Sequence, residues 1–322
     1  MPHKRSHLFG SLARITGAGI PVLRAGEILR GHSRDGISQE AMLALEAGIG
    51  RGESIAQSLR PALTEIEYRM VDAAETGGRL SAGFKHLEKY HALLDDARKK
   101  MRVAVAYPVL LLHMAALSSG VVANLNGTSP LTAMLWSLGV LGAVMLAVWF
   151  VARRVLAAAG KSLAADGVVR ALPVAGGAWK NLALTRWSAV MHFHILSGRK
   201  FSAALEAAAE ASGSRTLAAA TQRLAAVAAA GGSIAEAMRG ERVFPEYFAT
   251  GFATAEATGT LDVETELQMN MCMEAATTSM AVLAEWLPRV VYFGAAIFVV
   301  WQIFRLAGSI GGQYQRAIDG KF

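Results

Sequence analysis

One short stretch of this chain has residue types that could bind a nucleotide. Gly160-Lys161-Ser162 resembles the end of a phosphate-binding loop, G-x-x-x-x-G-K-[ST], in which backbone amides surround the phosphates. The first glycine of that pattern is replaced by Val155, so the loop is incomplete. We therefore interpret Lys161 as a cation beside an apolar segment and expect no nucleotide cofactor.

Paired carboxylates and histidines are the other candidates for chemistry. Intramembrane aspartyl catalysis needs two carboxylates near a membrane span, but Asp95 and Asp96 are adjacent in a charged stretch. His192 and His194 are two residues apart, and such residues point to different sides of a helix, unlike a chelating pair at i, i+4. The sequence predicts no catalytic residue and no metal site, so we expect a protein that is not an enzyme.

The composition indicates a membrane protein. The chain has 322 residues, of which 53% are hydrophobic and 18% charged, and its mean hydropathy is +0.34. The net charge of +7 could suggest nucleic acid, but the cations gather beside the apolar segments, where anionic lipid attracts them. We expect contact with membrane lipid and no nucleic-acid binding.

Three segments are long and apolar enough to cross a bilayer, which takes roughly 20 residues. Two of them lie between Arg102 and Arg153, an interval without Asp, Glu, Lys or Arg, at 103–125 and 131–152. A short turn at 126–130 joins these two segments. The third predicted span, 286–310, carries Arg289 and Arg305 near its ends, where long side chains can reach the headgroups.

The cations also predict the orientation of the spans. Arg98, Lys99, Lys100 and Arg102 precede the first span, and Arg153, Arg154 and Lys161 follow the second. Because cytoplasmic loops carry the excess of cations, the turn at 126–130 is predicted to lie outside. The N-terminus and two large polar regions, 1–102 and 153–285, are then cytoplasmic, and the tail at 311–322 is external.

Both cytoplasmic regions are predicted to be helical bundles, so the fold class is all-α. Apolar residues follow helical spacing in the first region, as at Ile66, Met70 and Ala74, without sustained alternation that would indicate strands. In the second region, alanine-rich stretches favour helices, and we expect Val263, Leu267 and Met271 to face a core. The single cysteine, Cys272, is expected to be buried.

The chain contains an internal repeat with a period close to 180 residues. Gly19 matches Gly198, and the stretch ESIAQSL from Glu53 matches GSIAEAM from Gly232. Further matched pairs are Glu75 with Glu256 and Pro108 with Pro288. Each copy is therefore predicted to be a bundle followed by a membrane helix. The extra span at 131–152 returns the chain to the cytoplasm, so that both bundles share one compartment.

This duplicated pattern resembles the inner-membrane platform proteins of type II secretion systems and type IV pili, the GspF/PilC family. The residues that carry the resemblance are Glu75, Gly78 and Leu80 in the first copy and Glu256, Gly259 and Leu261 in the second, with Tyr107-Pro108 and Leu287-Pro288 at the span entrances. The second copy departs from the family's Tyr-Pro, and the longer N-terminal extension of the family is missing.

The resemblance implies a scaffold in the bacterial inner membrane that does no chemistry itself. Its implied partners are a cytoplasmic hexameric ATPase, pilin or pseudopilin subunits, other inner-membrane assembly proteins and further copies of the chain. Glu75 and Glu256 have two interpretations: each is a solvated acid at a helix end before a glycine corner, or each lies at a functional corner, bonding the next helix N-terminus or contacting a partner. Pro108 and Pro288 would kink their spans. The alternative is a subunit of an oligomeric membrane transporter, which predicts more spans and intramembrane polar sites.

Overall fold

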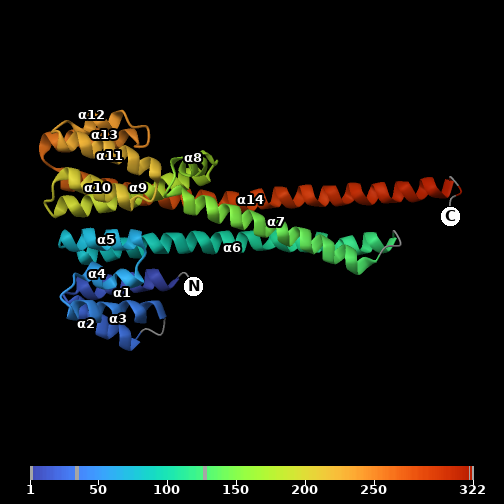
Figure 1. Ribbon diagram of the computed structural model, residues 1–322, viewed down its shortest axis with the longest axis horizontal. Helices are drawn as coiled ribbons and strands as arrows, with labels where there is room; N and C mark the ends of the chain where they lie inside the picture. Colours follow the sequence, from blue (N-terminus) through green and yellow to red (C-terminus); the bar gives the residue numbers. More distant parts are fainter. Residues whose placement is uncertain (1–2, 33–35, 126–128, 319, 321–322) are drawn as a thin grey trace. The chain divides into compact units, whose positions relative to one another are not determined.

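The computed structural model describes residues 3–32, 36–125, 129–318 and 320 (Figure 1). Every regular element in these described ranges is a helix, which confirms the all-α prediction. Two compact units are formed by the chain. One comprises the described residues of 1–96 and 156–280, and the other those of 97–155 and 281–322.

The two predicted repeats are reproduced helix by helix in the first unit. The first repeat contains α1 (His3–Gly17), α2 (Val22–His32), α3 (Gly36–Gly50), α4 (Ile55–Leu59), α5 (Glu65–Thr76) and the start of α6 (Leu80–Leu125). Their counterparts are the end of α9 (Ala175–Leu196), then α10 (Phe201–Ala211), α11 (Arg215–Ala229), α12 (Ile234–Arg239), α13 (Glu246–Thr258) and the start of α14 (Leu261–Ile318). A short 3-10 helix, Arg60–Ala62, and α8 (Leu163–Ala171) lie outside this correspondence.

Each repeat packs its helices around buried aromatic residues. Phe9 of α1 stacks on Phe84 of α6 in the first repeat, with ring centroids 6.3 Å apart. In the second repeat, Trp187 of α9 contacts Phe244 and Phe248, with centroids 5.2 and 5.7 Å away. All of these rings except Phe244 are less than 2% exposed, so the apolar faces of the helices account for the packing.

The second repeat also packs against the first within this unit. Helices α9 and α10 contact α5, and the backbone carbonyl of Phe193 lies so close to Gly77 that a Cβ there would come within 2.6 Å of it. At the edge of this contact, Arg69 of α5 pairs with Glu210 of α10 at 2.7 Å. The buried apolar residues of both repeats form one continuous cluster.

One expectation about the second repeat is wrong. Val263, Leu267 and Met271 were predicted to face a core, yet they are 62%, 53% and 38% exposed. The face of α14 that packs on α9 carries Thr265, Gln268, Cys272 and Ala276 instead, all of them buried. Periodicity detected the amphipathic helix, but its small and polar residues are the ones that fit against α9.

The second unit holds the membrane-spanning segments. Helices α6, α7 (Pro130–Ala159) and α14 are long and apolar enough to cross a membrane. Each contains its predicted span, at 103–125, 131–152 or 286–310; α6 ends where the first span was predicted to end, and α7 and α14 extend beyond theirs at both ends. The predicted tail at 311–322 is helical as far as Ile318. Most of the predicted turn at 126–130 lies outside the described residues.

Close packing joins α6 to α7. The Ser119 hydroxyl donates to the carbonyl of Ala133 at 3.2 Å, and a Cβ on Gly120 would come within 2.6 Å of Met134. Small residues permit such close approach between membrane helices. The small residues Ser119 and Gly120 therefore let α6 pack closely against α7.

Candidate functional site

The corner of the first repeat is built around Glu75. Helix α5 ends at Thr76, Gly78 adopts a left-handed φ of 64°, and α6 begins at Leu80. From the last turn of α5, the two carboxylate oxygens of Glu75 accept hydrogen bonds from the Ile55 and Ala56 amides, each at 2.8 Å. These amides open α4, where the unpaired N–H groups and the helix dipole favour a negative charge.

The corner of the second repeat has the same construction. Gly259 adopts a φ of 71° after α13, and Glu256 accepts a hydrogen bond from the Ile234 amide of α12 at 3.1 Å and from the Ser233 hydroxyl at 3.3 Å. Each glutamate was expected to bond the following helix or a partner. In both copies it bonds the N-terminus of the helix that precedes its own.

Four further predicted residues belong to these corners. Leu80 and Leu261 are partly buried against the core, and each begins the helix that leads into the membrane. Gly78 and Gly259 share the positive φ that disfavours other L-residues, which explains a glycine at this position in both copies.

The span entrances lie in the second unit, separate from the corners. Pro108 is inside α6 and Pro288 is inside α14. Tyr107 stacks on Tyr292 of α14, with ring centroids 6.1 Å apart, although 57% of Tyr107 remains exposed. The two proline positions therefore belong to neighbouring membrane helices.

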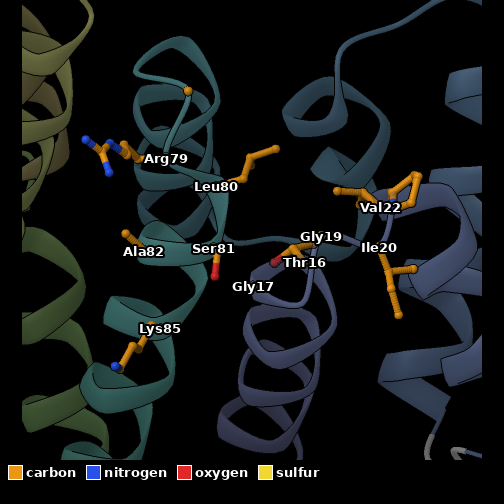
Figure 2. A pocket seen from close by; sticks show the side chains of 12 residues that line it. Thr16, Gly17, Gly19, Ile20, Val22, Arg79, Leu80, Ser81, Ala82 and Lys85 are labelled. Atoms are coloured by element: carbon orange, nitrogen blue, oxygen red, sulfur yellow. The ribbon is translucent and has the colours of Figure 1, made fainter.

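A cavity of about 630 Å³ lies beside the corner of the first repeat. Thr16, Gly17, Gly19 and Val22 line it from the end of α1 and the start of α2, and Gly78, Leu80 and Ser81 line it from the corner (Figure 2). The Ser81 hydroxyl donates to the Ala13 carbonyl at 3.0 Å, and the side chains of Arg79 and Lys85 extend away from α1 (Figure 2). The cavity wall thus combines two loop corners of one bundle.

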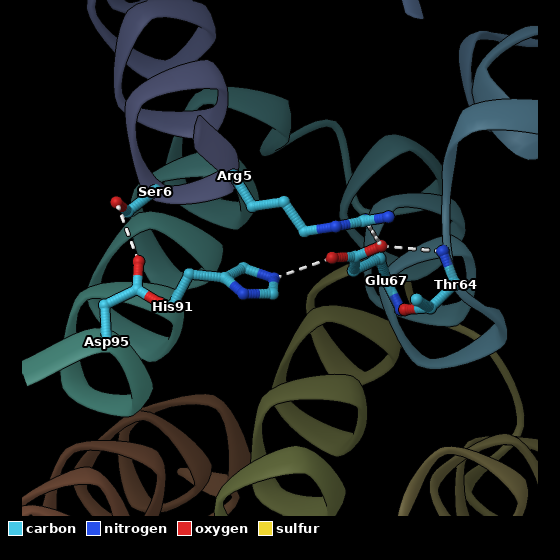
Figure 3. Close-up of polar contacts among 6 residues, drawn as sticks. All are labelled: Arg5, Ser6, Thr64, Glu67, His91 and Asp95. Carbon is cyan, nitrogen blue, oxygen red and sulfur yellow. Dashed lines mark hydrogen bonds and ion pairs between the residues drawn. The ribbon is translucent and has the colours of Figure 1, made fainter. Parts of the chain in front are cut away.

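The sequence did not reveal a buried ionic cluster inside the first repeat. Glu67 of α5 is 1% exposed, and its carboxylate pairs with Arg5 of α1 and lies 2.7 Å from His91 of α6 (Figure 3). The Thr64 amide donates to the same carboxylate at 2.6 Å and completes a capping box. Glu67 therefore joins three helices of the bundle.

The surroundings of Glu67 keep it ionised. Burial by itself raises the pKa of this carboxyl group, but the hydrogen bonds from His91 and the Thr64 amide and the charge of Arg5 lower it to about 2. The T-x-x-E spacing at Thr64 was the sequence signal that could have revealed one of these contacts.

The second repeat replaces this ionic cluster with apolar residues. The counterparts of Glu67, His91 and Arg5 are Phe248, Cys272 and Leu184, all of which are at most 1% exposed. The two copies thus share one arrangement of helices, but these core positions are ionic in the first copy and apolar in the second.

A second buried carboxylate, Asp166, joins α8 to α9 and α11 through hydrogen bonds. It is fully buried and accepts hydrogen bonds from Trp179 Nε1 at 2.7 Å, Ser214 Oγ at 2.7 Å and the Thr216 amide at 2.9 Å. Burial raises the pKa of Asp166, and these donors outweigh that effect and lower it. With all donors coming from α9 and the start of α11, Asp166 has a structural role.

The paired histidines of α9 are buried, as expected for core residues. His192 Nδ1 lies 3.2 Å from Thr265 Oγ1 of α14, and burial lowers the pKa of both His192 and His194. Among the described residues, no group of three or more His, Cys, Asp or Glu side chains is placed to hold a metal ion.

Comparison with known proteins identifies the repeat. The model of the family "Type II secretion system (T2SS), protein F" matches the chain twice, at residues 8–125 and 187–304. These matches include the corner, the charged helix and the span entrance of each copy. They also begin 179 residues apart, in agreement with the repeat found in the sequence.

Curated relatives carry names from two related machines. The chain is 24% identical to the type IV pilus assembly protein PilC of Myxococcus xanthus, over 92% of this chain and 79% of that protein. It is 29% identical to the type 4 fimbrial assembly protein PilC of Pseudomonas putida, over 78% of this chain and 69% of that protein. A shorter match, 31% identical over 31% of this chain and 26% of the relative, is to type II secretion system protein F of Pseudomonas aeruginosa. With both of its repeats matched, and with three helices in its described residues that are long and apolar enough to cross a membrane, this chain belongs to the type II secretion system protein F family.

Proposed function

We propose that this protein is the inner-membrane platform of a type IV pilus or type II secretion machine, and that it couples a cytoplasmic hexameric ATPase to the assembly or extraction of pilin subunits. The observation that carries the proposal is the match of the family model to both repeats. The names of the PilC and protein F relatives support a role in pilus assembly or secretion.

The architecture suits a coupling element. In each copy, a single helix begins at the glutamate corner of a bundle and continues through a candidate span, as α6 and α14 do. A displacement of the corner by a partner can therefore be passed along one helix. We place the N-terminus and both bundles in the cytoplasm, because the cations at 98–102 and 153–161 flank the first two spans.

The proposed role requires no chemistry in this chain. The ATPase supplies the work, the pilin or pseudopilin is moved, and further copies and other inner-membrane assembly proteins hold the platform in place. Pilins would be met within the membrane, since the turn at 126–130 leaves few residues outside between the first two spans.

The test is reconstitution of the full chain in lipid nanodiscs with the purified hexameric ATPase of the same organism. We expect nucleotide-dependent binding of the ATPase to loaded nanodiscs and none to empty ones. In parallel, deletion of the gene should abolish surface pili or secretion, and the intact gene should restore them. A folded chain that binds no ATPase in any nucleotide state, together with a deletion that leaves pili and secretion unchanged, would refute the platform. Transport assays in vesicles would then test the transporter alternative.

A further inference from the structure

The groove between α13 and α14 is an exposed apolar surface on the second repeat. A cavity of about 610 Å³ is lined there by Tyr247, Thr250 and Gly251 of α13 and by Leu267 and Met271 of α14, with Glu246 and Glu264 completing it. Val263 extends the same stripe of α14, one turn before Leu267, and is 62% exposed. Large apolar side chains grouped in one groove mark an interaction surface more often than scattered ones do.

The internal repeat shows how this kind of groove is used. The counterparts of Leu267 and Met271 in the first repeat are His86 and Tyr90, and both are buried. There, α9 and α10 of the second repeat pack against α5, and His192 of α9 lies within electrostatic range of His86. One groove is thus covered inside the chain, while its counterpart between α13 and α14 is open.

The covering helices themselves have counterparts. Helices α9 and α10 correspond to α1 and α2, which start the first repeat. Applying the same relation once more places α1 and α2 of a second copy on the α13–α14 groove. Phe193 of α9, which approaches α5, corresponds to Arg14 of α1, so this second contact would have more charge than the first.

The charges of the two surfaces are complementary. The interval from residue 243 to 288 contains seven acids and no Lys or Arg, and two of these acids, Glu246 and Glu264, line the groove itself. Helices α1 and α2 carry the exposed cations Arg14, Arg24 and Arg30 beside the exposed apolar side chains of Leu23 and Ile28, with Glu27 as the acid of this surface. Arg14, Arg24 and Arg30 form surface ion pairs with Glu88, Glu27 and Glu46, and such pairs contribute little to stability and are readily exchanged.

We propose that the α13–α14 groove binds the α1–α2 surface of a second copy of this chain. This contact is head-to-tail, because each copy offers a different surface to each neighbour. Copies with the same orientation in one bilayer are related by rotation about the membrane normal or by translation in its plane, so repetition of the contact forms a ring or an open row of copies. The inference needs neither an ATPase nor a pilin, so its failure leaves the proposed function untouched.

Cysteine cross-linking in the full-length protein tests this geometry. In a Cys272→Ser background, one tagged copy carries Leu23→Cys and a differently tagged copy carries Leu267→Cys, and the two are mixed in nanodiscs and oxidised. We expect a disulfide-linked dimer at least tenfold more abundant than with the control pair Leu43→Cys and Leu267→Cys. Leu43 of α3 is 55% exposed and Leu23 is 39% exposed, so lower accessibility would not explain a weaker control. Equal yields for the two pairs, or a dimer linked only through two Leu267→Cys sites, would overturn the head-to-tail contact.

Charge exchange provides an independent measurement on the same preparation. Glu246→Lys with Glu274→Lys should reduce the cross-linked dimer at least fivefold, and Arg14→Glu with Arg24→Glu on the other copy should restore it. The matched control is the exposed Glu40→Lys of α3, which should have no effect. Circular dichroism establishes that each variant is folded. Loss of the dimer without restoration by the reciprocal change, in folded protein, would contradict the assigned α1–α2 surface.

Discussion

The two corner glutamates perform the same task with unequal strength. Glu75 receives two backbone N–H groups at 2.8 Å and is half-buried, whereas Glu256 is exposed and receives one amide at 3.1 Å. Charged hydrogen bonds to helix N-termini are strongest when they are short and shielded from water. The first corner is therefore the more firmly held of the two.

We predict that Glu75→Ala destabilises the protein by about 1–3 kcal/mol, because two amides of α4 lose their acceptor. Glu256→Ala should have a smaller effect. Thermal unfolding in detergent, monitored by circular dichroism, ranks the stability losses of the two variants. Glu75→Gln is the control that keeps a hydrogen-bond acceptor but removes the charge. A larger loss for Glu256→Ala would contradict the assigned contacts.

Glu67 makes the stability of the first repeat depend on pH. Its pKa falls from the ordinary 4.5 to about 2 on folding. The stabilisation is therefore fully present above pH 4.5 and is lost as the pH falls towards 2.

For Glu67→Gln we predict a loss of about 3 kcal/mol at neutral pH, because Arg5 is left without its buried partner. The side-chain oxygen of the introduced glutamine can still accept the hydrogen bond from the Thr64 backbone N–H, so the N-terminal cap of α5 is preserved. Unfolding measured between pH 7 and pH 2 should show a flatter dependence than in the wild type. Glu65→Gln, on the exposed face of the same helix, serves as the control. A profile as steep as that of the wild type would exclude Glu67 as the responsible group.

At the scale of helices, the sequence predicted more than it did for single contacts. Helix existence follows from local periodicity and alanine content, and α10 and α11 are found at the alanine-rich stretches. Which face of α14 is buried depends on its neighbours, so Val263, Leu267 and Met271 could not be placed from spacing alone. The Glu67 cluster was missed for the same reason, since it joins residues 62 and 24 positions apart.

The two membrane prolines offer a test at this scale. Each lies inside a continuous helix, where the missing N–H leaves a backbone carbonyl of the preceding turn without its usual partner. If the spans flex there during the proposed coupling, Pro108→Ala or Pro288→Ala should lower pilus number or secretion severalfold while protein abundance stays constant. Leu110→Ala, an exposed site two residues beyond Pro108, is the matched control. Unchanged function in both proline variants would remove the prolines from the mechanism.

The orientation of the whole molecule stays a prediction, and it can be tested directly. In a Cys272→Ser background, we expect Ser129→Cys to react with a membrane-impermeant maleimide in spheroplasts. Leu43→Cys should react only after the membrane is opened, because α3 belongs to a bundle that the distribution of cations predicts to be cytoplasmic. Reversed labelling of the two sites would place the bundles outside.

The duplication made the architecture readable from the sequence, because matched landmarks such as Glu75 and Glu256 define two equivalent bundles. It could not reveal how far their cores had diverged. Arg5, Glu67 and His91 correspond to Leu184, Phe248 and Cys272, a difference that appears only once the counterparts are located in space. Acid should therefore destabilise the first bundle before the second, because only the first contains the Glu67 cluster.

Helix α6 runs without interruption from Leu80 to Leu125. Each residue of an α-helix advances the chain by about 1.5 Å and turns it by about 100°, so the angular phase of the span is fixed by the number of residues that follow the Gly78 corner. One alanine inserted near residue 100 would turn every later side chain by about 100°, while seven would nearly restore the original phase. A rigid, continuous helix couples the orientation of its two ends in this way, and a flexible linker does not. Loss of function with one inserted residue and recovery with seven would mean that the protein transmits rotation as well as position.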